Sequence, residues 1–234
     1  MFDRALRFSL TAYSYEYSDL QVQFYNAVTA STVVDNAGKL RISGVEGDFN
    51  FKVPGVDALS LHGSAAYNDA EYRDFIGQCY AGQTVAQGCN LVRNATNTAF
   101  TSQDYSGLTP PKAPKWGAQL GATFDVELSP GLSFIARGDA THTSSYNYTD
   151  ALRPDGVQGA VTKFDATLAV AGTDERWKLS LIGRNLTNKL VVSSANDFSF
   201  TGGTGTGTAV GVVADLNAIV DRPREIYVEF ALKF

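Results

Sequence analysis

The residue types that most often carry out catalysis are few in this sequence. Its two histidines are His62 and His142. Serines lie near both of them, at Ser60, Ser64, Ser144 and Ser145. A serine hydrolase needs its serine on a strained turn, in contact with a histidine and a third, orienting polar group. The sequence shows no such turn around these serines, so it predicts no catalytic residue. Both histidines are interpreted as structural side chains on strands.

The two cysteines, Cys79 and Cys89, lie in a polar stretch that contains glycine. A metal site would need further cysteine or histidine ligands at a suitable spacing, and neither histidine is near in sequence. The spacing favours a disulfide that closes a short loop in an oxidising compartment. Two free thiols are the alternative. No metal ligand is predicted.

Charge and glycine content exclude two further classes of function. The 19 basic and 24 acidic side chains give a formal net charge of −5, so no basic surface for nucleic acid is expected. Residues 202–208 alternate glycine with threonine, but no Gly-Lys-Ser/Thr follows them. A phosphate-binding loop is therefore excluded, and a flexible loop is expected. No residue is predicted to bind a cofactor.

The elements that position these residues are strands. Apolar residues alternate with polar or small ones from Trp116 to Val126, which is typical of a long strand with two different faces. The same period recurs near residues 6–12, 59–67, 132–138, 164–170, 177–181 and 226–234. No stretch has helical spacing, and none approaches the roughly 20 apolar residues of a membrane helix. The chain is predicted to be all-β.

One strand changes phase. Leu40 and Ile42 share one parity, whereas Val45, Phe49 and Val53 share the other. A bulge near residues 43–44 would re-aim the side chains that follow. If the strand crosses a membrane, an upper part that stands clear of the bilayer would explain the change equally well.

Short and long connections alternate along the chain. Residues 54–57, 128–131 and 172–175 have turn composition. Residues 75–112, 147–157 and 197–221 are long, polar and irregular, and residues 29–38 form a moderate connection. This alternation predicts an antiparallel up-and-down meander of about eight strands. In outer-membrane barrels the short turns are periplasmic and the long loops are extracellular.

Strand length and side-chain placement favour a transmembrane barrel over a soluble sheet. Several runs reach the roughly nine to eleven residues that cross a bilayer at a tilt. Aromatic residues at the run ends suit the two membrane–water boundaries; they are Tyr13, Tyr15, Tyr17, Tyr67, Tyr72, Trp116, Tyr146, Tyr148, Trp177 and Phe234. In a soluble sheet, the alternative, they would cap turns.

Charged residues alternate with the apolar runs. Facing lipid, each would cost about 2–4 kcal/mol at the bilayer midplane, so they are predicted to face the lumen. The candidates are Arg137, Asp139, Lys163, Asp165, Lys178, Arg184, Glu229 and Lys233.

Two segments carry a family resemblance. Residues 183–189, Gly-Arg-Asn-Leu-Thr-Asn-Lys, resemble a run in the penultimate strand of TonB-dependent outer-membrane receptors. The closing residues 222–234 resemble the last strand of that family, which alternates apolar residues and ends on an aromatic residue. The apolar set here is Ile226, Val228, Phe230, Leu232 and Phe234. In the family this terminal strand is linked to recognition by the barrel-assembly machinery.

The resemblance implies a location in the outer membrane of a Gram-negative bacterium, surrounded by its lipid. It also implies import of a scarce extracellular solute: a ferric siderophore, a cobalamin or an oligosaccharide. Family members carry a signal peptide, a TonB-contacting segment and a plug ahead of a barrel of about 22 strands. None is recognisable here, so residues 1–234 are expected to form the carboxyl-terminal part of such a barrel, without a plug domain. TonB would act only through a plug supplied by the parent protein.

That interpretation predicts a chain that is neither an enzyme nor, in isolation, a competent transporter. One alternative is a self-standing small outer-membrane barrel with a structural or adhesive role. A second is a soluble β protein, which the missing signal favours and the outward apolar faces oppose.

Overall fold

The computed structural model describes residues 5–26, 30–172, 176–203 and 205–233, and these residues form a β structure. Their helical content is one 3₁₀ turn, η1 (Val85–Gln87). Among the described residues no helix is long and apolar enough to cross a membrane. The predicted fold class is confirmed.

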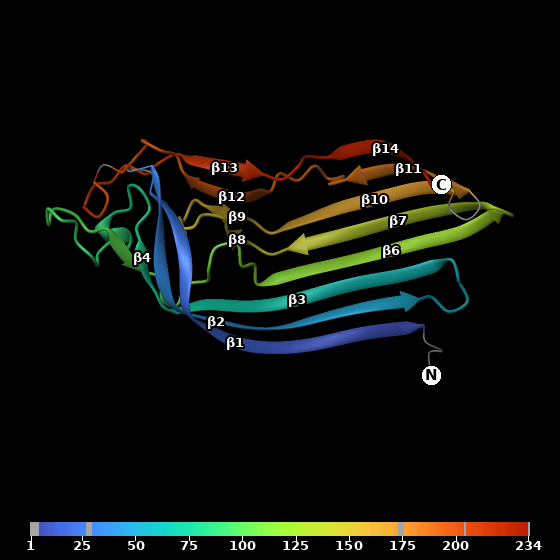
Figure 1. Ribbon diagram of the computed structural model, residues 1–234, viewed down its shortest axis with the longest axis horizontal. Helices are drawn as coiled ribbons and strands as arrows, with labels where there is room; N and C mark the ends of the chain where they lie inside the picture. The colour runs from blue at the N-terminus through green and yellow to red at the C-terminus, as the bar shows by residue number, and fades with distance from the viewer. Residues whose placement is uncertain (1–4, 27–29, 173–175, 204, 234) are drawn as a thin grey trace.

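Eight antiparallel strands form one sheet in which each strand pairs with the next long strand along the chain (Figure 1). Its strands are, in order, β1 (Leu6–Asn26), β2 (Ser31–Lys52), β3 (Leu59–Asp74), β6 (Trp116–Ser129), β7 (Leu132–Thr143), β10 (Val161–Gly172), β11 (Trp177–Arg184) and β14 (Glu225–Leu232). The sheet is open, with β1 and β14 at its edges. The predicted meander of eight strands is therefore present.

The two ends of the sheet differ as the connections predict. β1 begins and β14 ends at the end that holds the short turns (Figure 1). Gly55 and Gly131 make two of those turns possible, with φ of 80° and 84°, values that side chains with a Cβ rarely adopt. The third predicted turn, residues 172–175, lies largely outside the described residues.

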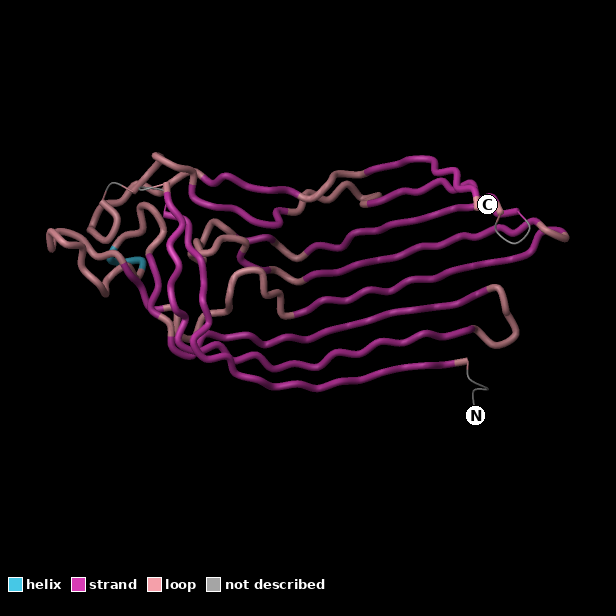
Figure 2. The backbone as a smooth tube through the Cα atoms, viewed as in Figure 1, coloured by secondary structure: helices cyan, strands magenta, loops and turns pink. Residues whose placement is uncertain are grey.

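The long connections are more regular than the sequence indicates. Each one contains a small two-stranded sheet at the opposite end of the molecule (Figure 2). These pairs are β4 (Ile76–Gln78) with β5 (Ser102–Asp104), β8 (Tyr146–Asn147) with β9 (Val157–Gln158), and β12 (Val192–Asp197) with β13 (Leu216–Val220). We call this end, with its loops and short sheets, the cap.

The moderate loop expected at residues 29–38 is wrong, because β2 already begins at Ser31 and pairs with β1 up to Asn26. The β1–β2 pair continues beyond the sheet and bends over its long-loop end (Figure 1). Two irregularities lie at this bend: Asp19 has a φ of 57°, and the register of β2 on β3 shifts between Lys39 and Leu40.

The register gives the sheet two chemically different faces. On one face, Asn50, His62, Gly121, Asp139 and Asp165 form a row across five strands, and we call this the polar face. The other, the apolar face, exposes large apolar side chains on β1, β2, β6, β10, β11 and β14. Those that are at least half exposed include Phe8, Leu10, Trp116, Leu120, Ile226, Val228, Phe230 and Leu232. A face of this composition suits lipid.

Of the two explanations for the phase change, the bulge near residues 43–44 is wrong. The pairing of β2 with β3 runs without a shift from Leu40 to Lys52. Leu40 and Ile42 therefore lie on the polar face, like Glu46 below them. Leu40 is buried there among aromatic side chains, because at this height the cap covers the polar face. The phase change marks the part of the strand that enters the cap.

Part of the predicted aromatic girdle is also wrong. Tyr67, Trp116 and Trp177 lie on the apolar face by register. Tyr13, Tyr15 and Tyr17 instead lie on the polar face. The Tyr13 hydroxyl donates to Asn68 Oδ1 (3.3 Å), across Gly44 of the strand between them. A Cβ on Gly44 would meet Tyr13 Oη at 2.5 Å, so the missing side chain makes room for this contact. Tyr72 is buried in the cap.

The run at residues 183–189, which resembles the receptor family, forms a turn whose hydrogen bonds connect three strands. Asn185 and Asn188 have φ of 46° and 51°, which places a turn directly after β11. The Asn185 side chain is buried and bonds both the amide and the carbonyl of Lys189, and also the carbonyl of Arg222. The Asn185 amide donates to Asp165 Oδ1 of β10 (2.7 Å). This turn therefore joins β10 and β11 to the start of β14.

We expect Asn185→Ala to lower the free energy of unfolding by about 1–3 kcal/mol, because it removes the hydrogen bonds of the buried Asn185 side chain to the backbone of Lys189 and Arg222. Heat-modifiable gel migration of the folded chain in detergent measures the change as a lower melting midpoint. Asn217→Ala, at an exposed position of β13, should stay within about 0.5 kcal/mol of the wild type. Equal midpoints for the two variants would contradict this role of Asn185.

Candidate functional site

The cap has an aromatic core. Phe24, Leu40, Tyr72, Phe75 and Tyr105 are buried together, and the Phe75 and Tyr105 rings stack at 5.1 Å. Burial raises the pKa of the Tyr105 hydroxyl well above its ordinary value, and this hydroxyl donates to the Gln78 carbonyl (2.7 Å). The bent β1–β2 pair and the first long connection therefore pack as one unit.

A buried arginine joins the other two long connections to that unit. The Arg153 side chain is 3% exposed, and its Nη1 donates to Asp197 Oδ1 (2.6 Å) and to the Ala214 carbonyl (2.8 Å). Asp197, 7% exposed, accepts the Ala81 amide through its other oxygen (2.8 Å). One ion pair thus ties together all three long connections. Asp155, which is 58% exposed, also pairs with Arg153, and this contact lowers the pKa of its carboxyl.

Sequence reasoning missed Arg153 and Asp197. The available signal was local: residues 153–156 read Arg-Pro-Asp-Gly, a turn composition, and the Gly156 amide does donate to the Arg153 carbonyl. That signal locates a turn. It does not indicate that the arginine is buried, or that its carboxylate partner lies 44 residues further along the chain.

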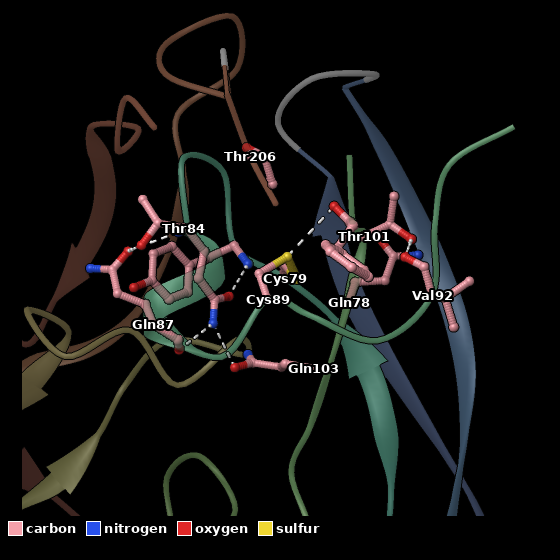
Figure 3. Close-up of a disulfide and its surroundings, with 12 residues drawn as sticks. Gln78, Cys79, Thr84, Gln87, Cys89, Val92, Thr101, Gln103 and Thr206 are labelled. Atoms are coloured by element: carbon pink, nitrogen blue, oxygen red, sulfur yellow. Dashed lines mark hydrogen bonds between the residues drawn. A yellow bond between two sulfur atoms is a disulfide. The ribbon is translucent and has the colours of Figure 1, made fainter. Parts of the chain in front are cut away.

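The structure joins Cys79 and Cys89 in a disulfide, with Cα atoms 5.7 Å apart (Figure 3). Between them, Gln87 accepts from the Thr84 amide at the start of η1. The Gln83 side chain donates to Gln103 Oε1 (2.7 Å) and thereby fastens the closed loop to β5. The cysteine pair therefore fixes one wall of the cap.

The glycine-rich run forms the opposite wall. It was expected to be a flexible loop, but it packs closely against residues 81–101. Gly207, with a φ of 69°, has so little space that a Cβ would lie 1.9 Å from the Phe100 carbonyl oxygen. The Gly82 amide donates to Thr206 Oγ1 (2.7 Å). Close backbone contact explains these glycines better than flexibility does.

Between these walls lies a cavity of about 470 Å³. Hydroxyl groups, a side-chain amide and aromatic rings line it. The lining residues include Tyr25, Gln78, Phe100, Thr101, Thr206 and Thr208. Its described lining contains no charged side chain. Such a cavity can hydrogen-bond an uncharged polar group and contact an apolar surface.

The predicted charged residues share one face of the sheet. Arg137, Asp139, Lys163, Asp165, Lys178, Arg184 and Glu229 all fall on the polar face by register. Lys233 lies directly after β14, where its amide donates to the Arg176 carbonyl. Lys163 pairs with Asp221 near the cap (3.1 Å). The terminal-strand residues Ile226, Val228, Phe230 and Leu232 project from the apolar face, and Phe234 lies outside the described residues.

A polar cluster occupies the middle of the polar face. Arg137 donates to both oxygens of Asp139 (2.7 and 3.1 Å), and His62 Nε2 lies 2.8 Å from Asp139 Oδ1. His62 and Asp139 are on β3 and β7, with Gly121 of β6 between them. A Cβ at Gly121 would lie 2.4 Å from the imidazole, so this glycine makes the contact between the two strands possible. His142 is on the apolar face, where its Nδ1 lies 2.9 Å from Thr162 Oγ1.

The comparison that decides the family comes from the sequence. Residues 1–186 match the family described as TonB dependent receptor-like, beta-barrel. The chain belongs to this family. Proteins of the TonB-dependent receptor family lie in the outer membrane of Gram-negative bacteria, and the family is one of receptors and transporters rather than enzymes. The resemblance of residues 183–189 and 222–234 to this family was therefore a correct guide. No curated protein matches the chain.

Solved TonB-dependent receptors have the same fold. The ferric yersiniabactin uptake receptor FyuA from Yersinia pestis is 14% identical with a TM-score of 0.63, and the match covers 99% of this chain and 28% of that one. The siderophore receptor PiuA from Acinetobacter baumannii is 18% identical with a TM-score of 0.60, covering 98% and 26%. The ferric citrate transporter FecA is 17% identical with a TM-score of 0.59, covering 99% and 29%. This TonB-dependent receptor chain thus spans less than a third of the length of each of these three receptors.

Loss of the buried carboxylate should open the cap. Asp197→Asn leaves the Arg153 guanidinium buried without its full partner, a change that costs about 3–5 kcal/mol. Asp155→Asn is the matched control, because it removes an exposed partner of the same arginine and should cost about 0.2–1 kcal/mol. Hydrogen exchange of the Ala81 amide measures both effects. Equal protection of this amide in the two variants would show that the buried Arg153–Asp197 pair does not hold the three long connections together.

Proposed function

We propose that residues 1–234 form the carboxyl-terminal part of a receptor barrel whose parent protein imports a scarce extracellular solute. The observation that carries this proposal is the cap: three long connections are ordered around one buried ion pair, and the first and third of them, with Tyr25 of β1, enclose a cavity at the long-loop end. In outer-membrane barrels that end faces the exterior. The solute class is a ferric siderophore, a cobalamin or an oligosaccharide.

In this proposal the polar face lines the lumen of the parent barrel. The eight predicted charges and the cluster of His62, Arg137 and Asp139 would then contact the plug or the passing solute. Energy from the TonB system would reach the receptor only through a plug domain that the parent supplies. Seven of the eight charges lie on the face opposite the lipid-suited one, and this position supports the assignment.

The terminal strand has a separate role in the proposal. Its apolar residues, Ile226, Val228, Phe230 and Leu232, would present the strand to the barrel-assembly machinery in the periplasm. Their exposure on the face opposite Glu229 keeps them available for such recognition.

The alternative is a self-standing small barrel with a structural or adhesive role. In the described structure the sheet is open, and both β1 and β14 are edge strands. Lipid cannot satisfy the hydrogen-bonding groups of such edges. The open sheet therefore favours a place inside a larger barrel over a self-standing one.

The proposal predicts that the 234-residue chain alone transports nothing. Purified chain in liposomes should take up a ferric siderophore, cobalamin or an oligosaccharide no faster than protein-free liposomes. Folding is verified first by heat-modifiable gel migration, so that a null result refers to folded protein. Uptake above the protein-free level would overturn the proposal.

The cavity should contribute to solute binding in the parent receptor. We expect Phe100→Ala to weaken binding of the imported solute about tenfold, because about two methylene equivalents of contact are lost. Titration calorimetry with the three solute classes identifies the solute and measures the change. Val210→Ala, at an exposed position of the glycine-rich loop, is the control. Unchanged affinity in Phe100→Ala would place the solute elsewhere.

A further inference from the structure

The apolar face contains a groove of about 640 Å³ near its long-loop end. Its floor consists of small residues that pair directly across three strands: Gly47 on β2, Ala65 on β3 and Ala118 on β6. Larger side chains surround this floor, namely Phe8, Leu10, Val45, Phe49, Tyr67 and Trp116. The groove is therefore almost entirely apolar, and its volume is in the range of roughly 300–1,000 Å³ that is typical of ligand sites.

The surroundings of the groove change in polarity along the strands. The Tyr67 and Trp116 rings are in contact at its upper end, with centroids 4.8 Å apart. Closer to the cap, the exposed Lys115 ammonium lies 3.7 Å from the Asp69 carboxylate. The order toward the membrane interior is charged, then aromatic, then apolar. A lipid in the outer leaflet has the same order, because its polar head, interface and chain follow one another.

We propose that this groove holds one acyl chain of an outer-leaflet lipid, with the polar head beside Lys115 and Trp116. The groove is continuous with the lipid-facing surface of the sheet, so lipid is the molecule that reaches it first. An acyl chain lying on this small floor would also contact the larger side chains that surround it. This inference is independent of the imported solute.

Native mass spectrometry of the 234-residue chain, extracted from outer membranes in mild detergent, tests the proposal. The wild type should retain lipid after washing. Ala65→Phe fills the floor and should reduce retention about tenfold, the loss expected when about two methylene groups lose contact. Ala122→Phe is the matched control, because it adds the same ring to the apolar face of β6 outside the groove. It should retain lipid like the wild type.

A second variant and a second measurement guard against a folding defect. Ala118→Leu fills the floor with a smaller side chain, and heat-modifiable migration verifies its fold. In the Trp177→Phe background, Trp116 is the remaining tryptophan. Lipid brominated in its acyl chain should quench Trp116 emission with a saturable component, and Ala118→Leu should remove that component.

The mass of the retained lipid distinguishes its source, because a phosphorylated glycolipid with many chains and a two-chain phospholipid both fit the groove but differ in mass. Three results would overturn the proposal: no lipid retained by the wild type, equal retention by Ala65→Phe and Ala122→Phe, or a second copy of the chain retained in place of lipid.

Discussion

The constraint on which this structure depends is that a strand in lipid must form its backbone hydrogen bonds with other strands, because the bilayer core offers no water. Each long strand meets this constraint by pairing with the next one. The pairing then fixes which side chains share a row, and so it places Asp139 on one face and Leu120 on the other. The edges at β1 and β14 are subject to the same constraint, which is why we place the sheet inside a larger barrel.

Side chains on two strands contact each other here across the strand between them where that middle strand has a glycine and therefore no side chain in the way. Tyr13 reaches Asn68 over Gly44, and His62 reaches Asp139 over Gly121. On the apolar face, a row that contains Gly47 leaves a groove rather than a contact. Gly44 and Gly121 on the polar face thus each allow two polar side chains to meet, whereas Gly47 on the apolar face forms part of the floor of the groove.

The cap is organised by a different interaction. A buried ion pair costs desolvation, which its attraction offsets only when the remaining hydrogen-bonding groups are also satisfied. Arg153 and Asp197 meet this condition through the Ala214 carbonyl and the Ala81 amide. The pair selects one arrangement of the three connections. The disulfide and the closely packed glycines then fix the walls of the cavity within that arrangement.

The sequence by itself determined the all-β class, the number of long strands, the end at which the long loops gather and the family, because alternation, turn composition and the two carboxyl-terminal segments are local patterns. It did not determine the cause of the phase change near Leu40, the face on which Tyr13 lies or the burial of Arg153. Each of these depends on a partner distant in sequence: the aromatic core of the cap, Asn68 and Asp197. Local patterns specify which side chains alternate along a strand. Only the packed tertiary structure decides which residues, distant in sequence, the side chains of each face contact.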